Sequence, residues 1–241
     1  MDWVELRALP AELRLQLSYP RRVPGYAERV LRDMEALGVE RVAVEGGSLV
    51  LLGKGFRNAV FLVATERGEA ALKVRRDDAP STSVGREALV HAAANRAGVG
   101  PILFGSGEHS LLMEVVVGRP LRLWLEEASG EEVRRVVGEV LRQCRALDLA
   151  GIDHGELSRA RKHVIVTADA SVKLIDFGAA RFSSRPRNVT SIVRYLTSRE
   201  VMQLLEEKLG SPELDLELVR EYARTLSEES YRRVLSSLRV I

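Results

Sequence analysis

The chain has 241 residues, of which 46% are hydrophobic and 29% are charged, an ordinary composition for a folded protein with room for one sizeable domain or two lobes. The formal net charge of +2 does not by itself demand a polyanionic partner, and no hydrophobic run approaches the ~20 residues that a membrane helix needs. The single cysteine, Cys144, excludes an intrachain disulfide and fits a reducing cytoplasm, and the acidic, amphipathic start is not expected to be a secretory signal.

The first half of the sequence predicts a β-rich lobe behind a partly helical start. Residues 1–45 are expected to form an N-terminal helical extension and the first strand. Over 39–76, short β-rich runs alternate with glycine turns, which predicts an antiparallel sheet of four or five strands. A helix is expected over 82–97 and another strand over 109–121, so that this lobe spans 46–116.

The second half, residues 117–241, predicts a mainly helical lobe. Its clearest helix has a hydrophobic stripe at spacings of three and four residues, formed by Val133, Val136, Val137, Val140, Leu141, Cys144 and Leu147. Two hairpin strands follow at His163–Thr167 and Val172–Ile175, and then come a basic loop and two or three C-terminal helices. The fold class is therefore α+β, with a β-rich lobe and a reduced helical lobe.

Two glycines, Gly53 and Gly55, lie between two predicted strands in the sequence LLGKGFRNAVFLV. Glycine lets backbone N–H groups approach phosphate oxygens, because no side chain stands in the way. Two glycines in a hairpin are also common without any ligand. A phosphate-binding loop and a plain hairpin are therefore both open for this segment.

One of only five lysines, Lys73, lies inside the apolar strand AALKV. Burying an ammonium group is costly unless an anionic group meets it, so Lys73 either points to solvent or has an acidic partner. Glu87, in the following predicted helix, is the candidate partner. A Lys73–Glu87 pair would hold the ammonium ready for a phosphate.

A third set of polar residues surrounds the predicted hairpin. His154, Glu156 and His163 lie in the loop between the long helix and a buried strand, and Asp176 begins the sequence DFG directly after the second strand. The strand would deliver the carboxylate to a site, the phenylalanine would pack inward, and the glycine would permit a sharp turn. Structural zinc is not expected, because the chain is poor in cysteine and the histidine spacing is irregular.

Taken in order, these motifs resemble those of protein kinases: a glycine-rich loop, a strand lysine, a helix glutamate, a connecting strand, a His-x-acid loop and Asp-Phe-Gly. The resemblance covers about Leu49 to Arg181. The chain looks most similar to minimal atypical archaeal serine/threonine kinases, such as RIO-type kinases and the small kinase of the tRNA-threonylcarbamoylation complex. It implies a bilobal protein-kinase-like fold, with the N-lobe and hinge over 46–116 and a reduced C-lobe over 117–241.

The resemblance also implies how ATP would be bound. Gly53 and Gly55 would cover the phosphates, and Lys73, paired with Glu87, would contact the α- and β-phosphates. A hinge would hold the adenine through backbone hydrogen bonds, and its residues would be Met113, Glu114 and Val116. Asp176 would bind Mg²⁺ that bridges the phosphates.

Two positions depart from the kinase pattern. Glu156 stands where the catalytic base is normally an aspartate, and its extra methylene group shifts the reach of the carboxylate. The loop that follows is two residues longer than the corresponding loop of kinases. Strand alignment places His163 where a kinase has a metal-binding asparagine. An imidazole suits Mn²⁺ better than Mg²⁺. These departures predict slow catalysis, use of Mn²⁺, or no catalysis.

A basic segment, residues 181–199, follows the DFG sequence. It contains five arginines, and no acidic residue occurs between Asp176 and Glu200. The segment is either a solvated loop or a surface on which an acidic partner or RNA docks.

The leading function is that of a cytoplasmic, ATP-dependent serine/threonine protein kinase that acts on a protein substrate and phosphorylates itself, with Mg²⁺ or Mn²⁺ as the metal. Two alternatives stay open. Glu156 and His163 favour a pseudokinase, that is, a nucleotide-dependent binding or assembly module. A small-molecule phosphotransferase is the third reading. No membrane partner is expected.

Overall fold

The computed structural model describes residues 1–79, 84–213 and 215–241. The architecture is α+β with an antiparallel sheet, which is compatible with the bilobal kinase-like fold expected from the sequence. The helix expected over 82–97 is α3 (Val84–Arg96), and the part of that prediction before Val84 lies outside the described residues.

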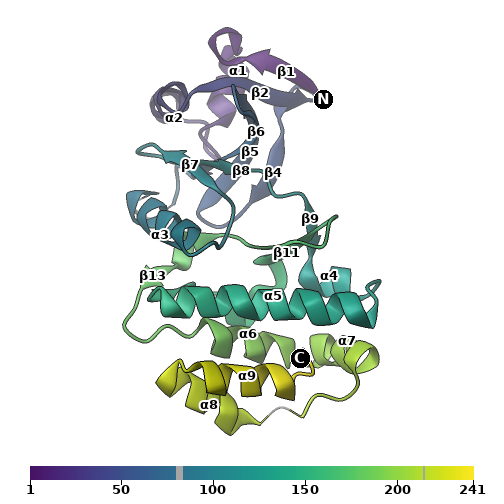
Figure 1. Ribbon diagram of the computed structural model, residues 1–241. Helices are drawn as coiled ribbons and strands as arrows, with labels where there is room; N and C mark the ends of the chain where they lie inside the picture. The colour runs from purple at the N-terminus through teal and green to yellow at the C-terminus, as the bar shows by residue number, and fades with distance from the viewer. Residues whose placement is uncertain (80–83, 214) are drawn as a thin grey trace. The chain divides into compact units, whose positions relative to one another are not determined.

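The chain divides into two compact units (Figure 1). The first unit comprises Met1–Leu89 and Ile102–Val115, and the second comprises Val90–Pro101 and Val116–Ile241. Helix α3 therefore contributes residues to both. The expected division of the chain at residues 45 and 116 stays a prediction.

The first unit is built on an eight-stranded antiparallel sheet. Its strands pair in the order β1-β2-β5-β6-β8-β7, with β3 beside β2 and β4 beside β5. They are β1 (Asp2–Glu5), β2 (Val39–Glu45), β3 (Ser48–Leu49), β4 (Leu51–Lys54), β5 (Asn58–Thr65), β6 (Gly68–Arg75), β7 (Leu103–Ser106) and β8 (Ser110–Glu114). The segment 39–76 contributes five of them, which confirms the sheet predicted there.

The helical start of the chain packs on this sheet. It consists of η1 (Leu6–Ala8), α1 (Ala11–Gln16) and α2 (Pro24–Ala36), and α2 contacts β2 and β8. On α2, Val30 and Met34 are fully buried and lie one turn apart, so the helix turns one apolar face inward. They share a core with Phe61 of β5 and Leu72 of β6. This core therefore supports β6, which carries Lys73, and β5, which follows the glycine hairpin.

The second unit is organised around the long helix α5 (Gly130–Leu149). All seven residues of its predicted hydrophobic stripe are fully buried, which confirms the helix and its orientation. The helix begins with a capping box that was not predicted. The Ser129 amide donates to the Glu132 carboxylate, and the Glu132 amide donates to the Ser129 hydroxyl oxygen. Cys144 is fully buried and is therefore a core residue, and its burial raises the pKa of the thiol well above the ordinary value.

The remaining elements of the second unit are short strands and helices. Strands β9 (Gly118–Pro120), β11 (Val164–Thr167) and β12 (Val172–Leu174) form a sheet in the order β12-β11-β9, and β10 (Ile152–Asp153) pairs with β13 (Arg181–Phe182). The helices besides α5 are α4 (Leu121–Leu125), α6 (Asn188–Leu196), α7 (Arg199–Leu209), α8 (Leu216–Thr225), α9 (Glu228–Ser237) and the 3₁₀ segments η2 (Leu157–Lys162) and η3 (Phe177–Ala179). The predicted hairpin is confirmed as β11 and β12.

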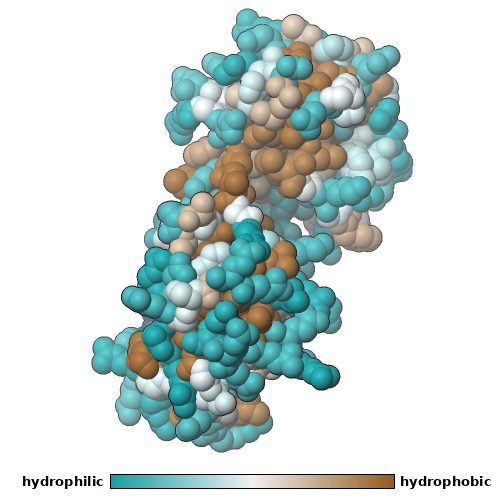
Figure 2. Space-filling view, turned by 90° about the vertical axis from the view of Figure 1, so that its right-hand side faces the viewer, coloured by the Kyte–Doolittle hydropathy of each residue, from teal (hydrophilic) through white to brown (hydrophobic). Residues whose placement is uncertain are grey.

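In the view of Figure 2, hydrophobic residues gather on the first unit, whereas the second unit is mostly hydrophilic. The exposed hydrophobic side chains of the first unit include Leu51, Leu52 and Phe56 of the β4–β5 hairpin. Within the described ranges, the structure contains no helix whose length and hydropathy would allow it to cross a bilayer.

Candidate active site

The glycine hairpin joins β4 to β5 in the first unit. Gly53 lies opposite Val60 in the ladder, and the Gly55 amide donates a hydrogen bond to the Asn58 carbonyl at 2.8 Å. A Cβ atom on Gly53 would meet nothing within 4 Å, and one on Gly55 would meet only the Asn58 carbonyl oxygen, at 3.9 Å. Packing within the chain therefore does not require glycine at either position. The space above the backbone is left open, as the phosphate-binding interpretation needs.

Lys73 and Glu87 form an ion pair inside the first unit. The Lys73 Nζ to Glu87 Oε1 distance is 2.7 Å, and the two side chains are only 6% and 13% exposed. Lys73 lies in β6, which pairs with β5 on one side and β8 on the other, so its strand is interior to the sheet. The solvent-facing alternative for Lys73 is thus wrong. An ammonium in this setting is stabilised by its carboxylate partner.

The three residues expected at the hinge are not equivalent in the structure. Met113 and Glu114 end strand β8, which lies between β6 and β7. The Glu114 amide donates to the Ile102 carbonyl at 2.8 Å, and its side chain accepts a hydrogen bond from the Ile102 amide at 2.9 Å. Val116 follows in an irregular segment that belongs to the second unit. The adenine-binding role of these residues stays a prediction.

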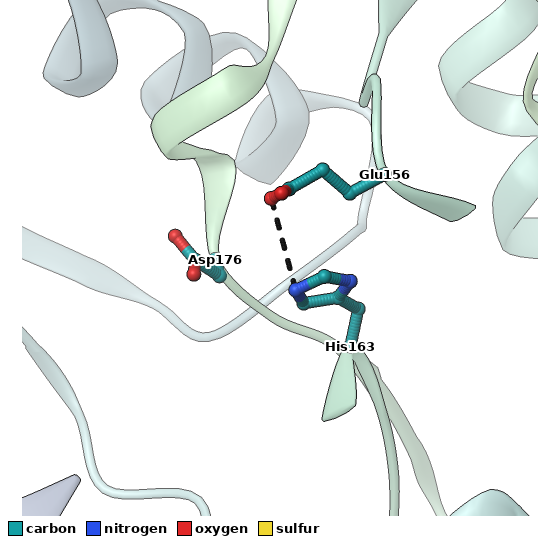
Figure 3. A group of neighbouring side chains, drawn as sticks. All are labelled: Glu156, His163 and Asp176. Carbon is teal, nitrogen blue, oxygen red and sulfur yellow. Dashed lines mark ion pairs between the residues drawn. The ribbon is translucent and has the colours of Figure 1, made fainter. Parts of the chain in front are cut away.

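Glu156, His163 and Asp176 come together in the second unit (Figure 3). Each offers one ligand atom, and the three atoms lie within 4.8 Å of one another. The Glu156 carboxylate and the His163 ring point toward each other, with 3.7 Å between Oε2 and Nε2. Glu156 directly precedes the 3₁₀ segment η2 and His163 directly follows it, so this segment brings the two side chains close together.

A buried hydrogen-bond network fixes the loop that carries Glu156. The Asn188 side chain accepts a hydrogen bond from the His154 amide at 2.9 Å, and its Nδ2 donates to Asp148 at 2.8 Å and to the Ile152 carbonyl at 2.6 Å. Asp148 also accepts from the Tyr222 hydroxyl at 3.1 Å. Burial raises the pKa of Asp148, and the donors around it oppose that shift. The network ties α5, β10 and α6 to the loop.

Asp176 has an unusual backbone conformation. Its φ is +68°, in the left-handed region that few residues other than glycine adopt. Its side chain accepts a hydrogen bond from the Gly178 amide at 3.3 Å. The left-handed angle turns the chain sharply just after β12, where the Asp176 carboxylate lies in one cluster with Glu156 and His163.

Phe177 anchors this turn in the core of the second unit. Its side chain is 1% exposed and stacks on His91, with 4.7 Å between ring centroids and 23° between planes. On another side it contacts the His154 ring at 5.2 Å. Hydrogen bonds fix both imidazole rings in place. The His91 ring is hydrogen-bonded to the Pro101 carbonyl at 2.8 Å, and the His154 ring to the Ile175 carbonyl at 3.1 Å. The predicted inward packing of the phenylalanine is thus confirmed.

The three ligand atoms fit a divalent metal ion. Two carboxylates and one imidazole are the donors that Mn²⁺ and other first-row transition ions accept, whereas Mg²⁺ prefers oxygen ligands alone. Asp176 and His163 are the metal residues expected from the sequence, and Glu156 joins them.

The basic segment 181–199 is largely solvent-exposed at its arginines. Arg181 forms an ion pair with Asp153, between β13 and β10. The other four arginines of the segment are exposed and form no ion pair with the residues that the structure describes. They are Arg185, Arg187, Arg194 and Arg199. A neighbouring arginine, Arg161 of η2, contacts Glu200 at 3.3 Å.

Several residues that shape the site escaped the sequence reading. Asp148 and Asn188 are 40 positions apart, and His91 lies in a helix of unremarkable sequence. The sequence indicated one of these residues, His154, which stands two residues before Glu156 in the loop predicted between the long helix and a buried strand. The sequence placed it in the loop without assigning it the ring contact with Phe177.

Comparison with known proteins supports a kinase-like assignment at a coarse level. No protein-family model matches the chain. The chain is similar to the KEOPS complex subunit Bud32 of Pyrococcus abyssi, with 35% identity over 100 residues, which are 40% of this chain and 44% of that subunit. An uncharacterized protein of Methanocaldococcus jannaschii is 25% identical over 113 residues, 46% of this chain and 96% of that protein. The similarity to Bud32 fits the kinase-like superfamily and spans less than half of that subunit's length.

Proposed function

We propose that the protein is an ATP-dependent serine/threonine protein kinase that also phosphorylates itself. The observation that carries the proposal is the buried ion pair, at 2.7 Å, between Lys73 of β6 and Glu87 of α3. A buried ammonium held in this way is suited to the negative charge of the α- and β-phosphates. The similarity to Bud32 supports the same class of protein.

The other residues would take the roles that their positions suggest. Gly53 and Gly55 would let backbone amides approach the phosphates, and Met113, Glu114 and Val116 would hold the adenine. Exposed Leu51 and Leu52, beside Gly53, would offer an apolar surface to the base. Asp176 and His163 would hold the metal, which supplies charge neutralisation on the phosphates. Glu156 would orient the hydroxyl group of the acceptor.

Phosphoryl transfer tests the proposal directly. The full chain is incubated with γ-labelled ATP, alone and with a basic acceptor protein, in Mg²⁺ and separately in Mn²⁺. We expect label on the protein and on the acceptor, and its loss in Lys73→Ala and in Asp176→Ala. The matched control is Lys208→Ala, which removes a lysine of α7 whose partner is Glu207 at 3.2 Å. Equal labelling in all variants would contradict the proposal.

A binding module without catalysis is the second candidate. The Glu156 carboxylate lies 3.7 Å from the His163 ring. This contact would compete with the use of the carboxylate as a base for the acceptor hydroxyl group. ATP binding without any transfer of label, in either metal, would support this candidate. ATP binding lost in Lys73→Ala would show that both readings share the same nucleotide site.

We also propose that the basic segment 181–199 binds a polyanionic partner, either an acidic protein or RNA. Four exposed arginines without described ion-pair partners support this. Binding that weakens steeply between low and physiological salt is expected for such a surface. The buried thiol of Cys144 agrees with the cytoplasmic setting that we propose, where thiols stay reduced.

A further inference from the structure

We infer that Glu156, His163 and Asp176 form a transition-metal site that binds its ion without any nucleotide. The inference deepens the proposed function and rests on it for the role of the metal, but its test needs neither ATP nor an acceptor. It gives Glu156 a second role, as a metal ligand of the nucleotide-free protein.

The distances support a shared ion. Protein ligands of Zn²⁺ lie at about 2.0–2.2 Å from the metal, so two atoms on one ion are separated by at most about 4.4 Å. The three ligand atoms here lie within 4.8 Å of one another, and the Glu156 Oε2 to His163 Nε2 distance is 3.7 Å. The limit of 4.8 Å exceeds 4.4 Å by about 0.4 Å, so the ligand atoms would have to move by roughly that much to share one ion.

The electrostatics of the cluster also favour a cation. Two carboxylates, those of Glu156 and Asp176, lie together, and like charges at this separation repel each other. A divalent ion placed between them converts the repulsion into attraction. In the described part of the chain, the one ion-pair contact recorded for Glu156 is with the His163 ring. Among the described residues, no lysine or arginine forms a salt bridge with the Glu156 carboxylate.

The site is preorganised by the backbone. The Ile175 amide donates to the His163 carbonyl at 2.9 Å, which fixes the residue before Asp176 to the residue that carries the imidazole. The Asn188 network holds the loop before Glu156, and the buried Phe177 ring holds the turn after Asp176. Ligands on a fixed scaffold lose little conformational entropy when the ion binds.

The donor set determines which ions are preferred. One imidazole and two carboxylates leave open coordination positions for water, as in sites of the catalytic type. Nitrogen ligation favours Mn²⁺ and, more strongly, Zn²⁺ over Mg²⁺, in the general order of first-row affinities. We therefore expect Zn²⁺ and Mn²⁺ to bind the nucleotide-free protein at concentrations at which Mg²⁺ does not.

Isothermal titration of the tag-free full chain with Mn²⁺, Zn²⁺ and Mg²⁺, without nucleotide, tests the inference. Electron paramagnetic resonance of bound Mn²⁺ provides an independent readout. We expect one Mn²⁺ per chain, and at least a tenfold loss of Mn²⁺ affinity in Glu156→Gln and in His163→Leu. His163→Asn is expected to lose Zn²⁺ and Mn²⁺ affinity more than Mg²⁺ affinity, because an amide oxygen replaces the nitrogen donor.

The matched control is Glu108→Gln. Glu108 also lies beside a histidine, with 3.6 Å to the His109 ring, but in the first unit and outside the cluster. Its removal is expected to leave Mn²⁺ binding unchanged, and circular dichroism verifies that all variants are folded. Wild-type affinity in folded Glu156→Gln, or Mn²⁺ binding only when ATP is present, would overturn the inference. Metal binding without any phosphoryl transfer would support the metal site and contradict the proposed kinase activity.

Discussion

The Phe177 ring stacks on the His91 imidazole at 4.7 Å between centroids, and Gly100 completes the contact from the backbone side. A Cβ atom on Gly100 would lie 2.7 Å from Cε2 of Phe177, closer than real contacts allow. The phenylalanine can keep its position only because residue 100 has no side chain. The direction of Asp176, one residue earlier, depends on that position.

Gly100→Ala is therefore expected to displace Phe177 and destabilise the protein. Overpacking of a core costs about 1–3 kcal/mol, and an alanine at positive φ adds about 1 kcal/mol. Gly98→Ala is the matched control, because Gly98 also has positive φ, +73°, but a Cβ there would meet nothing within 4 Å. Chemical denaturation of both variants measures the difference. Equal losses of stability would show that the contact with Phe177 is unimportant.

Substitutions in the Lys73–Glu87 pair are expected to have unequal effects. Glu87→Gln leaves a buried ammonium without its carboxylate and should cost about 1–3 kcal/mol of folding stability. Lys73→Met with Glu87→Leu removes both charges and should restore most of that stability, although nucleotide binding is lost. Urea denaturation with an ATP-binding assay separates the two readouts. A double variant less stable than Glu87→Gln would contradict the argument.

Asn188→Ala is expected to loosen the loop that carries Glu156. It removes three side-chain hydrogen bonds of a residue that is 1% exposed, and it leaves the His154 amide and the Ile152 carbonyl without this partner. Buried groups left unsatisfied cost about 1–3 kcal/mol each. We expect a loss of several kcal/mol, of order 3, in thermal or chemical unfolding.

Asn188→Asp is a sharper version of the same test. It keeps the size of the side chain but places a carboxylate within hydrogen-bond distance of buried Asp148. Two buried carboxylates so close cannot both ionise, so this variant should gain stability as the pH falls. A variant as stable as the wild type at neutral pH would mean that the network is not essential to the fold.

His109 is expected to make stability depend on pH. The ring is 5% exposed, contacts the tilted Tyr26 ring at 5.0 Å between centroids, and has no hydrogen-bond partner at either nitrogen among the described residues. Burial lowers the pKa of His109, and nearby Glu108 and Asp33 offset part of that effect. The unfolded chain therefore takes up the proton first, near pH 6.5. Stability is complete above that pH and declines as the pH falls through the lower pKa of the folded state.

Urea denaturation at several pH values between 7.5 and 5 measures this dependence. His109→Leu removes the titrating ring and should flatten the profile by up to about 1.4 kcal/mol per unit of pKa shift. The other three histidines remain in both proteins, so the difference between the profiles belongs to His109. Parallel profiles would show that His109 takes up its proton equally in both states.

Some of the fold was accessible from the sequence because it depends on local periodicity. The stripe from Val133 to Leu147 identified α5, and alternating residues with glycine turns identified the strands β2 to β6. Strands β1 and β7 lie at the two ends of the strand order and outside the run of alternating residues and glycine turns, and they form because neighbouring strands provide partners. Short strands at a sheet edge are defined by pairing and not by their own residues.

The candidate site divides in the same way. Lys73 and Glu87 could be paired from the sequence because a charged residue in an apolar strand requires a nearby partner. The contacts of Phe177 with His91, and of Asp148 with Asn188, join residues 86 and 40 positions apart. Nothing in the local composition around His91 or Asn188 indicates these partners, since tertiary packing alone selects them. The fit of Glu156 to the metal cluster depends on the turn η2, which no periodicity predicted.

The antiparallel register of β11 and β12 has a consequence for insertions and deletions. Val164 pairs with Leu174 and Val166 with Val172, so His163 and Asp176 lie at the open end of a hairpin whose turn is at residues 168–171. Changes of length in that turn leave the ladder in register and should preserve the spacing of the two ligands. A single residue added within either strand would reverse the faces of all residues beyond it. Related chains are thus free to vary in length at the turn, but not between the turn and the ligands.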